Sequence, residues 1–252
     1  MGTERRIGLA LGGGGVLGAA HIGVLNAFEE AEIPIDCLAG TSIGSFVAAL
    51  YAFETPLDRI EEIMLDLNWL DITNLNPSSL GLFTNDKLGT VIEEHLGSVE
   101  FSEASRAIAF VATDISTGEK VVLESGSVKD AVMASCAIPG LFAPMEVGER
   151  LLVDGGLVEN VPLETLRAMN VETVIGVDLT EKLTLAPPAN LVDVVLNTIY
   201  ILLARARAHE LDRAHLSITP DISSYSGVKM DKVAELIRIG YDAALPVVAE
   251  LQ

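Results

Sequence analysis

Basic residues are scarce in this chain. Its 252 residues include 16 lysines and arginines against 36 aspartates and glutamates, so the formal net charge at pH 7 is −20. Nucleic acids and anionic bilayers bind to basic surfaces, so this balance argues against both as electrostatic partners. We expect the acidity mainly to keep an apolar chain in solution.

Cysteines and long apolar runs are also few. Cys37 and Cys136 lie among apolar or small residues, which favours free buried thiols over a disulfide or a metal site. The most apolar stretch, residues 191–204, contains Asp193, Asn197 and Thr198 and is shorter than the roughly 20 residues that span a bilayer. It predicts a buried helix or one at a subunit contact.

The amino-terminal residues are not expected to form a signal sequence. Met1 to Arg6 are polar and lead straight into a strand-like segment, so the expected location is the cytoplasm. Half of all residues are apolar and no linker-like stretch interrupts the pattern, which predicts one domain over residues 1–252 with a large core.

Strand-like and helical patterns alternate along the chain. Strands are predicted over 6–11, 36–39, 107–113, 120–124, 151–154 and 173–179. Helices are predicted over about 18–31 and 42–53, with a third beginning near Pro56. Apolar strands separated by helices indicate a mostly parallel sheet covered on both faces, so the predicted fold is a three-layer α/β/α arrangement.

The pattern breaks down between Trp69 and Thr84, a predicted loop or lid. Its large apolar residues are expected to pack on the core rather than to touch a lipid surface. They are Trp69, Leu70, Leu75, Leu80, Leu82 and Phe83.

A glycine run follows the first strand. Residues 12–18 read Gly-Gly-Gly-Gly-Val-Leu-Gly, and backbone N–H groups in such a loop can converge on an anion at the start of a helix. Gly13, Gly15 and Gly18 also fit a dinucleotide-binding pattern, with Asp36 as the ribose ligand. That acid normally ends the second strand, whereas Asp36 begins it, so the anion site is favoured.

The second glycine motif surrounds a serine. Residues 40–44 read Gly-Thr-Ser-Ile-Gly between a short apolar strand and a helix, the context of a nucleophile elbow. Gly40 and Gly44 make room for the turn, and Ser42 is the candidate nucleophile.

Two kinds of base are open to Ser42. His209 and His215 suit the chain order of a Ser-Asp-His triad, whereas His21 and His95 suit structural roles. Alternatively, an apolar strand ends at Asp154 and is followed by two glycines, which places a carboxylate in open surroundings.

These three motifs together resemble the bacterial patatin-like phospholipase family. The match consists of Gly13–Gly18, Gly40–Gly44 and Asp154–Gly156, and it extends through 20–25, 112–114, 134–140 and 220–222. The resemblance implies a Ser42–Asp154 dyad without histidine, an oxyanion hole built from the N–H groups of Gly13, Gly14 and Gly15, and no metal or organic cofactor. It implies lipid or small acyl esters as substrates, with transient contact at a membrane surface.

Two positions depart from the family pattern. Leu17 stands where the family has a basic residue, and Glu159 stands where a small or amide residue is usual. The first departure predicts a preference for neutral esters over anionic phospholipids. A binding protein that has lost most turnover, and an acyltransferase that uses the same serine, are the alternative functions.

Overall fold

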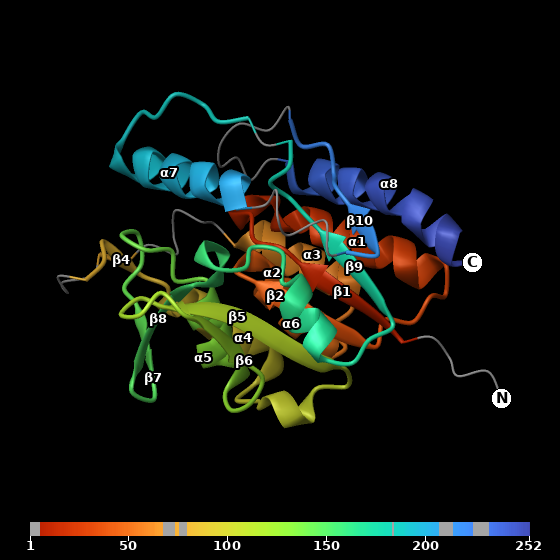
Figure 1. Ribbon diagram of the computed structural model, residues 1–252, viewed down its shortest axis with the longest axis horizontal. Helices are drawn as coiled ribbons and strands as arrows, with labels where there is room; N and C mark the ends of the chain where they lie inside the picture. Colours follow the sequence, from red (N-terminus) through yellow and green to blue (C-terminus); the bar gives the residue numbers. More distant parts are fainter. Residues whose placement is uncertain (1–5, 68–73, 76–79, 183, 207–213, 224–231) are drawn as a thin grey trace.

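The computed structural model describes residues 6–252 except 68–73, 76–79, 183, 207–213 and 224–231 (Figure 1). The strands are β1 Ile7–Leu11, β2 Cys37–Thr41, β3 Asn74–Leu75, β4 Phe83–Thr84, β5 Ala107–Asp114, β6 Lys120–Leu123, β7 Met145–Val147, β8 Arg150–Asp154, β9 Thr173–Val177 and β10 Leu216–Ile218. The α-helices are α1 Ala19–Glu30, α2 Ile43–Ala52, α3 Leu57–Asp66, α4 Asp86–Leu96, α5 Val128–Ser135, α6 Leu163–Ala168, α7 Leu191–Ala206 and α8 Val233–Leu251. Short 3-10 helices cover Gly15–Gly18, Phe101–Glu103 and Gly155–Leu157.

Eight strands form one mixed sheet in the order β10-β9-β1-β2-β5-β8-β7, with β6 also pairing with β5. The five strands from β10 to β5 run parallel, β6 and β8 pair antiparallel with β5, and β7 pairs antiparallel with β8. The predicted α/β class with a mostly parallel sheet is therefore correct. The sequence patterns missed β7 and β10, each of which is only three residues long.

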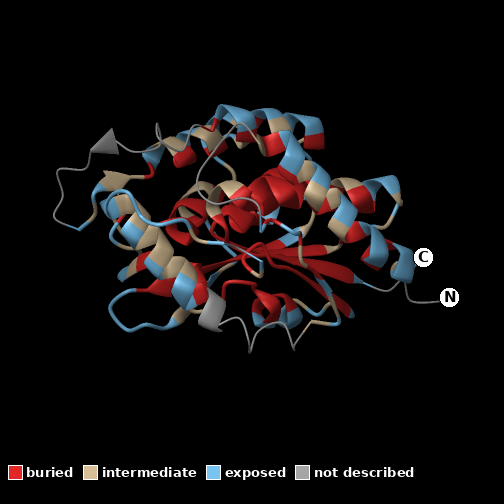
Figure 2. Ribbon diagram, turned by 90° about the horizontal axis from the view of Figure 1, so that it is seen from above, coloured by how far each residue is buried: buried red, intermediate tan, exposed pale blue. Residues whose placement is uncertain are grey.

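The apolar clusters on the two faces of the sheet differ in size. Leu9 and Leu38 belong to the large core that also contains apolar residues of α1, α2, α3 and α8, whereas Ala10 and Ala39 face the smaller cluster under α6. Successive strand residues point to opposite faces, so large and small side chains alternate between a thick and a thin layer. Figure 2 shows the strands buried between helices whose outward sides are exposed.

The predicted boundaries are correct to within a few residues, with one shift that affects the site. The second strand runs to Thr41 rather than Ala39, and α2 begins at Ile43. Ser42 therefore occupies the single position between strand and helix.

Two predictions that apolar segments are buried within the chain are wrong, and the alternative of a subunit contact for residues 191–204 stays a prediction. The helix over 191–204 is present as α7, but it lies at the surface, with Leu191 62% and Leu202 52% exposed. In the predicted loop, β3 and β4 form a short antiparallel ladder, and Leu80 and Leu82 are 60% and 39% exposed rather than packed on the core. Phe83 does pack against the core. Trp69, Leu70 and the side chain of Leu75 lie outside the described residues.

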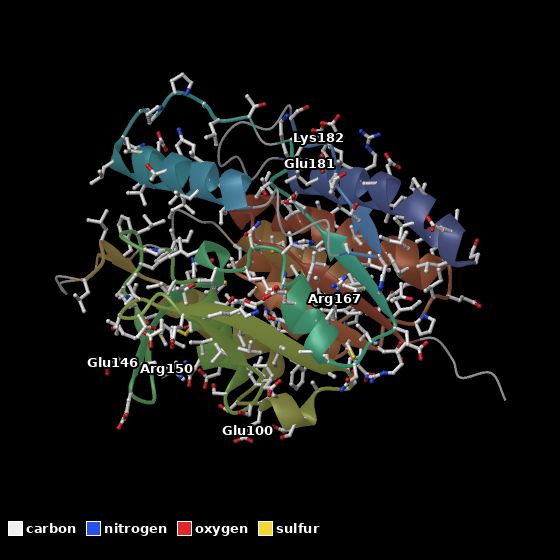
Figure 3. The ribbon with its side chains drawn as sticks, in the orientation of Figure 1. Glu100, Glu146, Arg150, Arg167, Glu181 and Lys182 are labelled. Carbon is white, nitrogen blue, oxygen red and sulfur yellow. The ribbon has the colours of Figure 1, made fainter. Side chains whose placement is uncertain are left out.

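Within the described residues, no helix has both the length and the apolar character needed to cross a membrane. Charged side chains lie at the periphery, as the labelled Glu100, Glu146 and Arg150 show in Figure 3.

Candidate active site

Three segments that are far apart in the sequence meet at one edge of the sheet. Leu11 pairs with Gly40 in the parallel β1–β2 ladder, so the glycine run and Ser42 leave the sheet side by side. Thr41 pairs with Val111, and Ala112 pairs with Asp154 in the antiparallel β5–β8 ladder. Asp154 therefore lies one position further along β5 than Thr41, where its carboxyl accepts a hydrogen bond from the Ser42 side chain.

Ser42 occupies a strained turn. Its φ of 54° and ψ of −129° lie where a residue with a side chain is rarely found, at a cost of about 1–3 kcal/mol. Its N–H donates to Ser135 Oγ at 2.9 Å, and that hydroxyl donates to the Val111 carbonyl at 2.7 Å. Ser45 Oγ donates to the Ser42 carbonyl at 2.6 Å. These bonds hold the turn that presents the Ser42 side chain to the pocket.

The flanking glycines are required by close backbone approach. A Cβ at Gly40 would lie 2.5 Å from Ser45 Cα, and one at Gly44 would collide with the Leu11 carbonyl oxygen. Both neighbours are backbone atoms that cannot move aside without shifting α2 or β1. The tight strand-to-helix turn expected from the sequence therefore has a steric basis in both glycines.

Asp154 is buried, with 8% of its surface exposed. Its backbone is fixed on both sides, because its N–H donates to the Ala137 carbonyl at 2.9 Å and its carbonyl accepts from Thr113 Oγ at 2.9 Å. Burial raises the pKa of its carboxyl to about 6, against the lowering effect of hydrogen bonds from the Ser42 side chain and the Gly156 N–H. A carboxylate with this pKa accepts a proton more readily than an exposed one.

The glycine run contributes two unengaged amides. The Gly13 N–H donates to the Asn160 carbonyl at 3.2 Å, which removes it from the three donors expected from the sequence. The N–H groups of Gly14 and Gly15 have no acceptor in the described part of the chain. The Gly14 carbonyl accepts from the Leu17 N–H at 3.2 Å and from the Tyr200 hydroxyl at 3.3 Å.

Neither described histidine near the sheet can serve Ser42 as a base. His21 is fully buried behind the glycine run, where burial lowers its pKa to about 4 and its neutral ring donates from Nε2 to the Gly12 carbonyl at 2.8 Å. His215 Nδ1 accepts from the Val174 N–H at the amino end of β9, whereas Ser42 follows the carboxyl end of β2. His209 lies outside the described residues.

The position of Asp36 also argues against the dinucleotide-binding interpretation. Asp36 precedes β2, and its carboxylate accepts from the Ile7 N–H at 2.7 Å at the amino end of β1. The length of a strand separates it from the glycine run. Cys37 and Cys136 are buried free thiols, and no cluster of three or more potential metal ligands occurs among the described side chains.

Ser42, Asp154 and Gly13–Gly15 line one pocket. Its other walls are mostly apolar and come from two loops and α7: Ile138, Pro139, Gly156, Leu157, Asn160, Leu196, Ile199, Tyr200 and Leu203. The sequence analysis missed α7 as a wall. Its signal was the spacing of Leu196, Ile199 and Leu203, which places them on one face of a helix.

Leu17 and Glu159, the two residues that depart from the family pattern, both have structural roles. Leu17 is 3% exposed and belongs to the main core. Glu159 is 4% exposed, and its carboxylate accepts from the Glu164 N–H at 2.6 Å and from Thr165 Oγ at 2.7 Å, while Lys120 Nζ pairs with it at 3.0 Å. Glu159 thus anchors the start of α6 and takes no part in the pocket.

The chain thus combines a mostly parallel sheet covered by helices, the α/β class, with a serine in a strand-to-helix elbow and a buried carboxylate beside it. The chain belongs to the patatin-like phospholipase family, whose sequence profile, described as "Patatin-like phospholipase", matches residues 9–167. Membership of this family is consistent with lipid acyl-hydrolase activity.

Relatives in other organisms match over 70% of this chain. Patatin-like phospholipase domain-containing protein 6 of Homo sapiens is 34% identical over 187 residues, which cover 14% of that protein. The uncharacterized NTE family protein Rv1063c of Mycobacterium tuberculosis is 34% identical over 180 residues, which cover 50% of it. The chain thus matches half or less of the length of these relatives.

Solved structures show the same fold at low sequence identity. VipD from Legionella pneumophila superposes with a TM-score of 0.64 at 13% identity, covering 98% of this chain and 67% of that one. The type III effector protein ExoU superposes with a TM-score of 0.56 at 13% identity, covering 97% and 53% respectively. This likeness supports the fold assignment alone.

Proposed function

We propose that this chain hydrolyses acyl esters of lipids, with Ser42 as nucleophile and Asp154 as its base. The observation that carries the proposal is the meeting, in one apolar-walled pocket, of a serine in a strained elbow and a buried carboxylate with a pKa of about 6. A base whose pKa lies near the working pH is effective both in accepting and in returning a proton.

The proposed reaction has two steps. Asp154 accepts the hydroxyl proton as Ser42 Oγ attacks the ester carbonyl, and the N–H groups of Gly14 and Gly15 stabilise the oxyanion. The protonated Asp154 then gives its proton to the leaving alcohol, which leaves an acyl group on Ser42. In the second step Asp154 takes a proton from water as the oxygen of that water attacks the acyl carbonyl, and it then gives this proton to Ser42 Oγ as the bond to the acyl group breaks and the carboxylic acid is released.

The pocket favours a neutral ester. Its side walls are mostly apolar, the side chains that line it include no lysine or arginine, and the protein as a whole is strongly acidic. We therefore propose neutral acyl esters as better substrates than anionic phospholipids, and the cytoplasm as the place of action.

Labelling with a fluorophosphonate probe tests the nucleophile. Wild type and Ser98→Ala, which removes an exposed serine, should react, and Ser42→Ala should not. Asp154→Asn should lower ester turnover by about 10²- to 10⁴-fold, because it removes the base. Turnover at the wild-type rate in Asp154→Asn would refute the dyad.

The pH dependence gives a second readout. The ionised form of Asp154 is the active one, so kcat/KM for a neutral ester should rise with pH through an apparent pKa of about 6 and then level off. If His209 were the base, His209→Ala would abolish turnover in a folded protein.

Two alternative functions share this site. An acyltransferase would pass the acyl group from Ser42 to an alcohol, so adding glycerol during turnover would yield a new ester instead of free acid. A lipid-binding protein without turnover would bind the ester and leave the fluorophosphonate unreacted.

A further inference from the structure

Helix α7 is apolar on two opposite sides. Leu196, Ile199, Tyr200 and Leu203 line the pocket. Four other residues are exposed by about half or more: Leu191 62%, Val194 47%, Ile201 48% and Leu202 52%. At 100° per residue these two sets fall on opposite sides of the helix. The polar Asp193 and Asn197 lie along one border between them, and the exposed Thr198 lies within the outer set, where its hydroxyl donates to the Val194 carbonyl at 2.7 Å.

The exposed side of α7 is unlike an ordinary solvent-facing helix surface. Among residues 191–203, Asp193 carries the only charge, although 21% of the whole chain is charged. A surface helix normally turns polar residues outward, and exposed apolar residues that gather on one face mark an interaction site. Leu191, Val194, Ile201 and Leu202 are called the α7 outer face below.

The position of this face identifies its occupant. The same helix forms a wall of the pocket that holds Ser42 and Asp154, so whatever covers the outer face lies about one helix diameter, roughly 10 Å, from the candidate nucleophile. A lipid layer that covers the α7 outer face contains the acyl esters that we propose as substrates of the pocket. An apolar helix face of this kind sinks into the boundary between head groups and acyl chains.

Charge selects the kind of lipid. Helices that bind anionic membranes carry several lysines and arginines beside the apolar face, whereas the sequence of α7 contains a single arginine, Arg205 in its last turn, and no lysine. The net charge of −20 also repels an anionic surface. We infer that the α7 outer face seats the protein on a zwitterionic or neutral lipid layer, beside the mouth of the pocket. The inference deepens the proposed function and rests on it for the identity of the substrate.

Co-flotation with vesicles tests this contact. The Ser42→Ala protein avoids any hydrolysis, and on that background Leu191→Ser/Leu202→Ser removes two leucines of the α7 outer face. The matched control, Leu65→Ser/Leu245→Ser, removes leucines that are 49% and 43% exposed on α3 and α8. We expect binding to phosphatidylcholine vesicles, at least tenfold weaker binding of the α7 variant, and unchanged binding of the control. Phosphatidylglycerol vesicles should bind less at low salt.

Several outcomes would overturn the inference. They are no binding to phosphatidylcholine, equal loss in both double variants, or stronger binding to phosphatidylglycerol. Sedimentation adds another: a dimer that dissociates in Leu191→Ser/Leu202→Ser would show that a second copy covers the face.

Turnover of a short, soluble ester separates this inference from the proposed function. In a Ser42-containing protein, Leu191→Ser/Leu202→Ser should leave that turnover unchanged, because neither residue lines the pocket. Vesicle binding through α7 without any ester turnover would refute the proposed function and leave the lipid contact standing. Ester turnover without vesicle binding would refute the lipid contact and leave the proposed function standing.

Discussion

Asp154 is held in the pocket at a cost to the folded state. Its pKa is about 6 in the folded protein against 3.8 for an unperturbed aspartate. Between these values the folded state binds more protons than the unfolded one, so stability falls as pH rises through this window. At pH 7 the whole penalty is present, and the difference in pKa corresponds to about 3 kcal/mol.

Replacing this carboxylate should therefore stabilise the protein. Asp154→Asn keeps an oxygen for the Gly156 N–H and removes the buried charge. We expect its free energy of unfolding in urea to exceed that of wild type by up to about 3 kcal/mol at pH 7 and by little at pH 4. The free energy of unfolding also falls as pH drops toward 4, because the low pKa of buried His21 makes its protonation unfavourable in the folded state. This loss is the same in both proteins. A variant less stable than wild type at pH 7 would contradict this account.

Leu17 belongs to the core, which changes what a basic residue there would do. Leu17→Arg would place a long charged side chain where leucine is 3% exposed. We expect the melting temperature to fall, with a loss of at least about 2 kcal/mol, and no gain in activity on anionic phospholipids. Leu17→Met, of similar volume, is the control and should lose less than about 1.5 kcal/mol. Unchanged melting of Leu17→Arg would show that position 17 reaches solvent.

Tyr200 fixes the peptide that joins Gly14 and Gly15. Its hydroxyl donates to the Gly14 carbonyl, and burial, with Asp154 nearby, raises its pKa to about 12, so it stays protonated. The carbonyl and the following N–H point in opposite directions, so this bond also orients the Gly15 N–H. Glycines on both sides otherwise make rotation of that peptide easy.

Tyr200→Phe removes only the hydroxyl. We expect kcat for a soluble ester to fall by up to about tenfold with little change in KM, because one neutral hydrogen bond is lost. The amide signals of Gly14 and Gly15 in an NMR spectrum should shift as well. Tyr51→Phe, at a tyrosine that does not line the pocket, should change neither. Unmoved glycine signals would exclude this role for Tyr200.

At the scale of elements, α1 and α8 cross with their backbones almost in contact, as Figure 1 shows for the long C-terminal helix. A Cβ at Gly240 would collide with the Ala20 carbonyl oxygen, and one at Gly23 with the Ile237 carbonyl oxygen. Because α1 also carries His21 under the glycine run, the seating of α8 helps to position the site.

Gly240→Ala tests this crossing. The added methyl group meets backbone that has no rotamer to change, so we expect a loss of about 1–3 kcal/mol in urea unfolding. Ala234→Leu adds a larger group on the exposed side of the same helix and should cost much less. Equal stability of Gly240→Ala and wild type would mean that the helices can separate freely.

Sequence periodicity predicted elements better than it predicted their surroundings. β1, β2 and β5 are apolar along their length, and the glycines at 40 and 44 mark the elbow by themselves. In α7, however, periodicity shows an apolar helix and does not say which side packs on the protein. The apolar residues on its exposed side therefore produce the same sequence pattern as residues buried in a core.

Residues of the candidate site could be predicted from the sequence where a short local motif contains them. Ser42 follows a strand and stands between Gly40 and Gly44, and Asp154 ends a strand next to Gly155, so each is marked by a local pattern. Ser135 and Tyr200 reach the site from α5 and α7 through tertiary packing, and no local pattern marks them. The use of the Gly13 amide by Asn160 depends on a residue nearly 150 positions away.

At the scale of the molecule, the acidic surplus acts on the folded state as a whole. The described ion pairs mostly involve exposed side chains, such as Arg59 with Glu62, and cannot offset a net charge of −20. Salt screens this self-repulsion. We expect the melting temperature to rise between 10 and 150 mM NaCl, by roughly 2–4 °C for each kcal/mol gained. A single cooperative transition would support the proposed single domain, and a melting temperature that falls with salt would contradict the argument.

The place of β1 in the sheet sets the order in which the site is completed during synthesis. Ser42 and Asp154 are both part of the nascent chain once residue 154 has been added, because the chain is made from its amino end. β1 pairs with β2 on one side and β9 on the other, so one edge of β1 stays open until residues 173–177 follow. Tyr200 and α8 are delivered later still. A nascent chain therefore carries both candidate catalytic residues before the scaffold that holds the glycine run in place exists.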